Sequence, residues 1–176
     1  MTLQIQLRHD LSPNENDAIE DRLYDHNSNS TGRRDGQGLG FVIRNEVGQM
    51  IGVAAGHTCS GTSELKQMWI DEGYRGRGYA RSLLNAFVAE ARRRGVRRIW
   101  VTSHNFQAPG MYEKEGFKRM AELKDGPRAT SMWFSAKRYQ VEKSELPRSR
   151  GLYPLWVISE HPATQNQCLL CPTKWT

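Results

Sequence analysis

A glycine- and arginine-rich segment offers the clearest chemistry in this sequence. Residues 69–80 read WIDEGYRGRGYA and follow a predicted strand. Apolar residues at helical spacing begin at Ala80, so the segment leads directly into a helix. Backbone N–H groups at a helix N-terminus are unpaired, and glycines let a phosphate approach them without a Cβ in the way. With arginines on either side, the pattern predicts a site for a phosphate-bearing ligand.

Two common phosphate-binding motifs are excluded for this segment. Gly73-x4-Gly78 is followed by Tyr79 and not by Lys and then Ser or Thr, so it is no Walker A loop. Gly76-x-Gly78 lacks the third glycine of a dinucleotide-binding fingerprint. The predicted site must therefore bind its ligand in another way.

Local patterns predict the elements that position this segment. Ser12, Pro13 and Glu15 have the spacing of a helix start, with Ser as the N-cap. From 80 to 91 the apolar residues share one helical face, and Gly95 marks the helix end. In chain order we expect a strand at 4–8, a helix from 13 to about 24, a long loop or frayed helix at 26–40, a hairpin of 41–44 and 50–58, a strand at 63–70, a helix from 80 to about 94, a strand at 98–103, a short helix at 108–115, and strands at 117–123 and 130–137.

Composition limits the class of protein. The chain has 176 residues, which fits one domain with at most a small appendage. It shows neither a membrane-spanning apolar run nor a signal-peptide pattern, so we expect a cytoplasmic protein. The net charge of +6 fits nucleic acid, an anionic cofactor or merely a soluble surface. No aromatic-interleaved basic motif is present, and we expect neither nucleic acid nor membrane as a partner. Cys168 and Cys171 form one Cys-x-x-Cys pair without a second at matching spacing, so no metal site is predicted.

The sequence resembles the GCN5-related N-acetyltransferase (GNAT) superfamily in two segments. That family's pyrophosphate loop has the pattern Gln/Arg-x-x-Gly-x-Gly/Ala, which occurs here as Arg75-x-x-Gly78-x-Ala80. The segment 105–117, NFQAPGMYEKEGF, is similar to the family's segment after its fifth strand, and its first residues resemble a small bacterial subgroup. The resemblance covers roughly residues 3–138.

The resemblance implies an α/β fold with a mixed, mostly antiparallel sheet of six to seven strands flanked by about four helices. The sheet would splay between its fourth and fifth strands, 63–70 and 98–103. Residues 1–139 would form the N-acetyltransferase domain, which binds acetyl-CoA. Residues 140–176 would be a C-terminal extension, for which a strand-forming segment, a dimerisation arm and a poorly ordered tail all stay open.

The resemblance also implies how acetyl-CoA would bind. Pantetheine would insert between the splayed strands and use main-chain groups of Met68 and Ile70, although residues 68–70 also fit an ordinary strand core. Asn105 would hydrogen-bond the pantetheine amide, or would simply be a turn residue that ends a strand. The full set of implied cofactor-binding residues is Met68, Trp69, Ile70, Arg75, Gly76, Arg77, Gly78, Tyr79, Ala80, Asn105, Ala108 and Tyr112.

Three residues would carry the chemistry. An amine must lose a proton before it attacks a thioester, and Glu64 stands in the position of the family's base. An exposed strand charge or a partner for Lys66 is the alternative for Glu64. Tyr112 would protonate the departing thiolate, unless it is a buried core tyrosine. The backbone N–H of Met68 would stabilise negative charge on the acetyl oxygen.

We therefore expect an acetyl-CoA-dependent N-acetyltransferase that transfers an acetyl group to the primary amine of a small molecule. The amine would attack directly within a ternary complex. A protein or peptide N-acetyltransferase and a non-catalytic CoA-binding regulator are the alternatives, and a homodimer stays open. His57 and His104 are further candidates for the base, although a lone histidine is more often structural.

Overall fold

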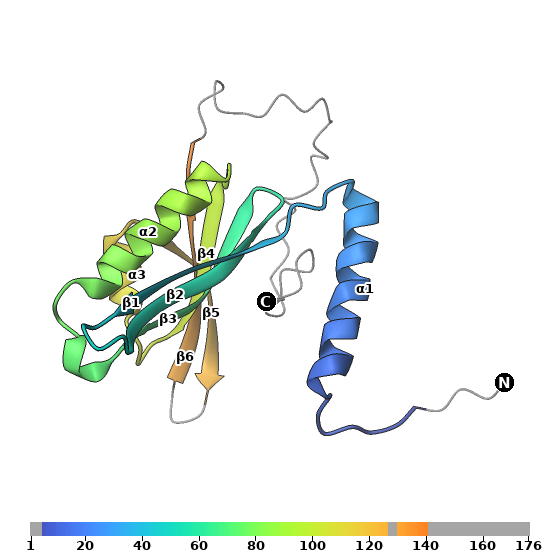
Figure 1. Ribbon diagram of the computed structural model, residues 1–176, viewed down its shortest axis with the longest axis horizontal. Helices are drawn as coiled ribbons and strands as arrows, with labels where there is room; N and C mark the ends of the chain where they lie inside the picture. The colour runs from blue at the N-terminus through green and yellow to red at the C-terminus, as the bar shows by residue number, and fades with distance from the viewer. Residues whose placement is uncertain (1–4, 127–129, 141–176) are drawn as a thin grey trace.

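The computed structural model describes residues 5–126 and 130–140 of the chain. Figure 1 shows the helices and strands of these residues. In chain order they are α1 (Pro13–Thr31), β1 (Gln37–Arg44), β2 (Met50–Cys59), β3 (Thr62–Ile70), the 3₁₀ turn η1 (Glu72–Tyr74), α2 (Tyr79–Arg93), β4 (Arg98–His104), α3 (Pro109–Lys114), β5 (Lys118–Gly126) and β6 (Thr130–Arg138).

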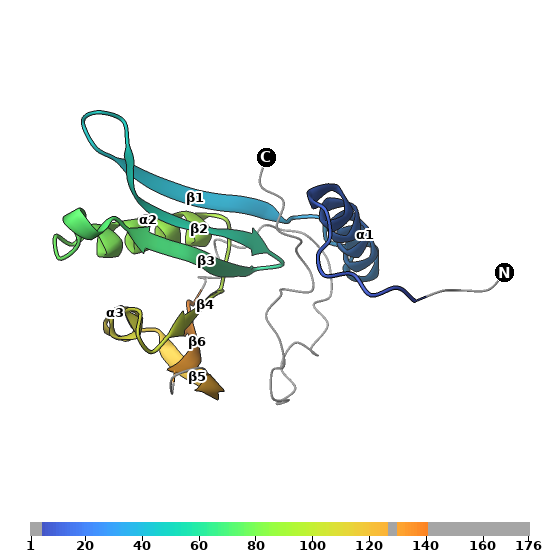
Figure 2. The ribbon, with the colours of Figure 1, turned by 90° about the horizontal axis from the view of Figure 1, so that it is seen from below.

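The six strands form one sheet in the order β1-β2-β3-β4-β6-β5. Neighbouring strands are antiparallel except β3 and β4, which are parallel. The β3–β4 pairing covers only Thr62 to Leu65 against Arg98 to Val101, after which the two strands separate. Figure 2 shows the β1–β2–β3 half and the β4–β6–β5 half running in different directions. The predicted mixed, mostly antiparallel sheet with a splay between these two strands is therefore confirmed.

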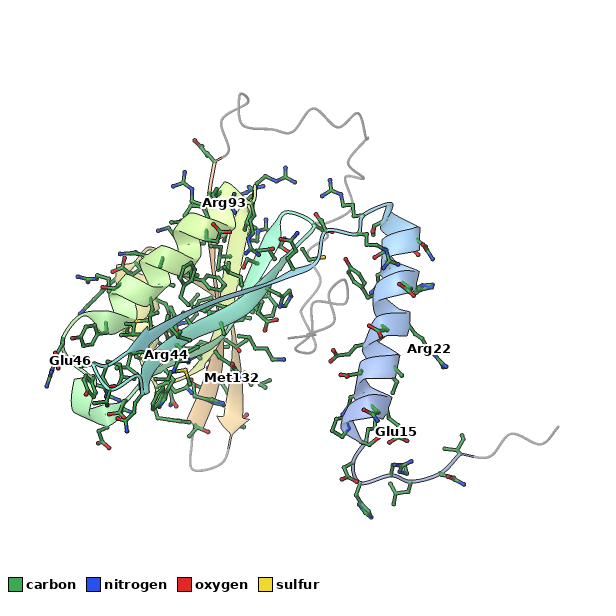
Figure 3. The ribbon with its side chains drawn as sticks, viewed as in Figure 1. Glu15, Arg22, Arg44, Glu46, Arg93 and Met132 are labelled. Carbon is green, nitrogen blue, oxygen red and sulfur yellow. The ribbon has the colours of Figure 1, made fainter. Side chains whose placement is uncertain are left out.

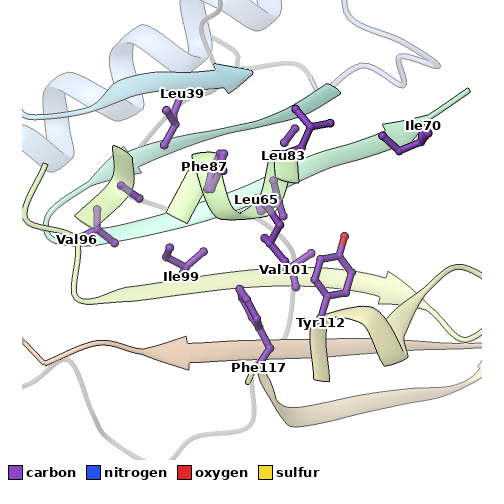
Figure 4. Packing of buried hydrophobic residues seen from close by; sticks show 13 residues of the cluster. Leu39, Leu65, Ile70, Leu83, Phe87, Val96, Ile99, Val101, Tyr112 and Phe117 are labelled. Carbon is purple, nitrogen blue, oxygen red and sulfur yellow. The ribbon is translucent and has the colours of Figure 1, made fainter. Parts of the chain in front are cut away.

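The core lies between α2 and the strands β1 to β4. The apolar face that the sequence predicts for this helix is buried, at Leu83, Leu84, Phe87 and Ala91. These side chains pack with Leu39, Leu65 and Ile99 from three different strands (Figure 4). Because burial of one such side chain stabilises a fold by about 1.5–3 kcal/mol, this packing holds α2 in place against the sheet.

The N-terminal part corrects two predictions. Ile5 to Arg8 form no strand, and Ile5 and Leu7 are exposed, because the apolar residues of this segment meet no partner strand. Of the two alternatives for the segment 26–40, the long loop is wrong and the helix holds for its first residues: α1 continues to Thr31 and ends at Gly32, whose φ of +66° is in the left-handed region that favours glycine. β1 then begins at Gln37 rather than at 41.

Helix α1 stands apart from the sheet in both views (Figures 1 and 2). Its start has the predicted capping box between Ser12 and Glu15. Arg22 points away from the sheet (Figure 3), and Leu23 is 47% exposed. The expected four flanking helices are thus three α-helices in the described ranges, of which α2 and α3 contribute to the core.

The predicted domain boundary at 139 stays a prediction, since residues 141–176 lie outside the described residues. The last strand ends at Arg138, and the N–H of Tyr139 donates to the carbonyl of Arg97 at 2.8 Å. This contact ties the end of the described chain to the start of β4.

Candidate active site

The predicted phosphate segment forms a cavity at the start of α2. Gly78 is the helix N-cap and has a φ of +83°, and Gly76 has a φ of +75°. A Cβ at either position would meet no neighbouring atom within 4 Å, so the main chain is open to a ligand there. The cavity measures about 350 Å³ and is lined by Ile70, Tyr74, Arg75, Gly76, Gly78, Tyr79, Ala80, Arg81, Met111 and Lys114.

Positive charge surrounds this cavity. The Nε of Arg75 donates to the carbonyl of Ile70 at 3.1 Å, which fixes that arginine at the end of β3. The Nε of Arg81 donates to Glu115 at 2.6 Å, and Lys114 adds an ammonium from α3. No side chain caps the N-terminus of α2, so its N–H groups remain available. Together these groups can bind a phosphate or pyrophosphate.

The half of β3 next to the cavity has a free edge. The N–H of Asp71 donates to the carbonyl of Ile51 on β2 at 2.9 Å. Main-chain groups alternate in direction along a strand, so those of Met68 and Ile70 face away from β2, toward β4. The described pairing with β4 has already ended at Leu65. The Met68 side chain packs against the core, so residue 68 can be a core residue and still offer its main chain to a ligand.

Tyr112 lies on α3 beside the gap between β3 and β4. It is 6% exposed, and its ring packs edge-on against Phe117 with centroids 5.8 Å apart. Its hydroxyl points from α3 toward the β3 side of the gap (Figure 4). Burial raises the pKa of Tyr112 to about 12, so the hydroxyl holds its proton at neutral pH.

Glu64 is not an exposed strand charge, because its side chain is only 12% exposed. It stands directly opposite His57 on β2, and the Nδ1 of His57 lies 3.8 Å from the Oε2 of Glu64. Burial raises the pKa of the Glu64 carboxyl, and the charge of Lys66 lowers it by less. A carboxylate with a raised pKa is a better acceptor for the proton of an ammonium group.

The placement of Glu64 depends on a close approach between β2 and β3. The register shifts between Ala55 and Gly56, so that Lys66 is an extra residue on β3 and forms a β-bulge. A Cβ on Gly56 would stand 1.7 Å from the main-chain oxygen of Glu64, so only glycine fits there. The bulge changes the alternation along β3 just before the free edge begins.

The structure brings half of the implied cofactor residues together. Six of them line the cavity: Ile70, Arg75, Gly76, Gly78, Tyr79 and Ala80. Arg77 lies on the same turn, but it donates to the carbonyl of Gly73 at 3.2 Å. Trp69 lies on β3 and is 43% exposed. Asn105 and Ala108 are exposed on the loop between β4 and α3.

Four cavity residues escaped the sequence analysis: Tyr74, Arg81, Met111 and Lys114. Arg81 follows Gly78 by less than one helical turn, and this spacing could have identified it. Lys114 could not be found in this way, because its place at the cavity depends on how α3 packs beside α2. The pairing of His57 with Glu64 also escaped the sequence analysis.

The described ranges, 5–126 and 130–140, hold no cluster of three His, Cys, Asp or Glu side chains that could bind a metal ion. No helix in those ranges is long and apolar enough to cross a membrane. The cytoplasmic location stays a prediction.

Two proteins illustrate what this chain resembles in sequence. Acetyltransferase Atu2258 of Agrobacterium fabrum is 31% identical over 122 residues, which are 69% of this chain and 89% of that protein. Blasticidin-S acetyltransferase of Streptomyces morookaense is 32% identical over 83 residues, which are 47% of this chain and 61% of that protein.

Solved structures and a family model agree with these relatives. The crystal structure of a protein from Agrobacterium tumefaciens described as an acetyltransferase has a TM-score of 0.73 at 28% identity and covers 78% of this chain and 100% of its own. The crystal structure of an acetyltransferase from Bacillus cereus has a TM-score of 0.64 at 25% identity and covers 76% of this chain and 98% of its own. Residues 5–117 match the model of the acetyltransferase (GNAT) family. The chain therefore belongs to the GNAT family of acetyltransferases and is an acyltransferase.

Proposed function

We propose that this enzyme is an acetyl-CoA-dependent N-acetyltransferase that acetylates the primary amine of a small molecule. The observation that carries the proposal is the free edge of β3, where the outward main-chain groups of Met68 and Ile70 lead into the positively charged cavity. A long ligand with amides in its middle and phosphates at one end fits such a path. Acetyl-CoA has this form.

The groups around the cavity suit a pyrophosphate. Gly76 and Gly78 offer unobstructed main chain, while Arg75, Arg81 and Lys114 bring positive charge. Each hydrogen bond to a charged group contributes about 1.5–3 kcal/mol, so a few of them would anchor the cofactor firmly. Asn105, on the loop after β4, would hydrogen-bond the pantetheine amide.

The chemistry needs one proton removed and one supplied. Glu64 would take a proton from the acceptor ammonium, and the free amine would then attack the acetyl carbon directly within the ternary complex. The N–H of Met68 would stabilise the negative charge on the acetyl oxygen. As the new C–N bond forms and the C–S bond breaks, Tyr112 would give its proton to the departing sulfur.

Two observations support a small acceptor. The blasticidin-S acetyltransferase relative is named for a small-molecule substrate. The carboxyl of Glu64 is largely buried, which favours a slender amine over a bulky chain. The identity of the amine depends on surfaces around Glu64 that carry no readable motif.

A thiol-release assay tests the proposal. Acetyl-CoA is incubated with the enzyme and a panel of blasticidin S, aminoglycosides, simple amines and peptides, while calorimetry measures acetyl-CoA binding. We expect binding and thiol release with at least one small amine. Release with peptides alone would indicate a protein acetyltransferase, binding without release a regulator, and absence of binding would refute the proposal.

A further inference from the structure

His57 and Glu64 form a buried acid–base pair across β2 and β3. The His57 side chain is 7% exposed, and its Nδ1 is buried with no hydrogen-bond partner among the described residues. Buried polar atoms are usually hydrogen-bonded, so an orphaned imidazole nitrogen calls for a physical reason. Its neighbour across the strands is the carboxylate of Glu64, 3.8 Å away.

The residues directly opposite the pair on the two outer strands carry no charge. On the far side of His57, β1 places Gly38 opposite it, and β4 places Trp100 opposite Glu64. Neither neighbour titrates. Lys66 is the charged group that acts on both, and it lowers the pKa of each. Burial is the larger cause in both cases: it lowers the pKa of His57 and raises that of Glu64.

The pair lies on the face of the sheet opposite α2. Leu65 packs into the core beneath α2, so its neighbour Glu64 faces the opposite side, as does His57 in register with it. The separation of 3.8 Å is longer than a hydrogen bond but within the range of a close electrostatic contact. An imidazolium at that distance favours the ionised form of a carboxylate.

We propose that His57 is a positioning residue that acts through Glu64: its imidazole orients the carboxylate and, once protonated, keeps it ionised where the acceptor amine must lose its proton. This role rests on the proposed function, because it supplies the partner for the base of that reaction. It differs from a direct base role for His57, since the proton of the amine goes to the oxygen of Glu64.

The first test needs no substrate. The imidazole signals of His57 are followed by NMR during a pH titration of the wild type and of Glu64→Gln. Removing the carboxylate should lower the pKa of His57, because the imidazolium loses its partner. The same titration behaviour in both proteins would overturn the proposal.

The second test uses the rate of thiol release. In His57→Leu, kcat at about pH 6 should fall roughly tenfold more than at about pH 8.5, so the acidic limb of the pH–rate profile moves to higher pH. His57→Asn keeps a donor near the Nδ1 position but cannot carry charge, so it should recover the rate at the higher pH only. If His57→Leu has the same pH–rate profile as the wild type, the proposal is overturned.

Ser63→Ala is the matched control. The hydroxyl of Ser63 donates to the main-chain carbonyl of His57 at 2.8 Å, and Ser63 is 1% exposed. This variant should lose stability but keep the pH profile, because the pair is left intact.

If His57→Leu does not fold, His57→Asn and the NMR titration decide. A wild type without turnover on any acceptor refutes the acetyltransferase proposal, whereas an active wild type with an unchanged His57 titration in Glu64→Gln refutes only the role of His57.

Discussion

The two halves of β3 differ in the number of strands with which they pair. Thr62 to Leu65 pair with β2 on one side and β4 on the other, whereas Gln67 to Ile70 pair with β2 alone. The doubly paired half buries the carboxyl of Glu64 and thereby raises its pKa. The singly paired half leaves main-chain groups free along one edge. One strand can therefore supply both an acid–base group and a row of main-chain donors and acceptors, because its pairing ends midway.

A β-bulge at Lys66 separates the two halves of β3. Gly56 lets β2 and β3 approach closely at that point. The free half then runs into η1 and the glycine turn before α2. Changes in the free half should therefore affect cofactor binding, while changes in the doubly paired half should affect pH dependence.

The largest effect is expected at Gly78, in the turn that precedes α2. In Gly78→Glu, a side chain and a like charge would occupy the place of the pyrophosphate. The loss of two charge-assisted hydrogen bonds, at about 1.5–3 kcal/mol each, predicts a fall in acetyl-CoA affinity of roughly 10³-fold by calorimetry.

Gly48→Glu is the control for backbone strain. Gly48 has a φ of +81°, close to the +83° of Gly78, and a Cβ there would likewise meet no atom within 4 Å. It lies in the turn between β1 and β2, so the substitution should cause a similar loss of stability and no loss of affinity. Equal affinity in a folded Gly78→Glu variant would remove the pyrophosphate site from this turn.

The next largest effect is expected at Tyr112, beside the gap between β3 and β4. Tyr112→Phe removes one hydroxyl and should lower kcat about 10²-fold or more, with acetyl-CoA binding nearly intact. Tyr139→Phe is the control, because burial also raises the pKa of Tyr139 to about 12. Its hydroxyl is buried with no hydrogen-bond partner in the described ranges, and its ring lies beside Arg92 at the end of α2. Turnover within about twofold of the wild type in Tyr112→Phe would make Tyr112 a core residue only.

Local pattern was enough to predict the elements around the candidate cofactor site. The glycine turn, the apolar face of α2 and the Tyr112 segment each lie within a short stretch of sequence. The length of α1 stayed open between a loop and a frayed helix, because the polar residues of 26–31 favour a loop on their own. The start of β1 at Gln37 was missed. Arg81 and Lys114 meet at the cavity only after two helices have packed.

The pairing of His57 with Glu64 could have been predicted from the sequence. Ser60 and Gly61 both have positive φ and form the two-residue turn between β2 and β3. Counting outward from such a turn places His57 opposite Glu64. What the sequence could not supply is the burial of the pair, which depends on the neighbouring strands β1 and β4.

A smaller and pH-dependent effect is expected from Glu64→Gln, which keeps the shape of the base and removes its charge. The rate should fall about 10²-fold near pH 6.5 and by less than tenfold near pH 9, where more of the amine is already neutral. Glu122→Gln on the exposed strand β5 is the control. A higher KM with unchanged kcat would instead assign Glu64 to substrate binding.

The smallest effect is one on stability, and its sign follows from burial. The folded protein raises the pKa of Glu64 above its ordinary value of 4.5, so in the window just above 4.5 the folded state binds more protons than the unfolded state. The free energy of unfolding therefore falls as pH rises through this window, and ionised Glu64 destabilises the fold at neutral pH. Glu64→Gln should raise the Tm by a few degrees at about pH 7, and this gain should disappear near pH 4. Thermal unfolding at the two pH values measures the difference. If Glu64→Gln changes the Tm equally at the two pH values, burial of the Glu64 charge does not cause the change. The two halves of β3 would then differ in their strand pairing alone.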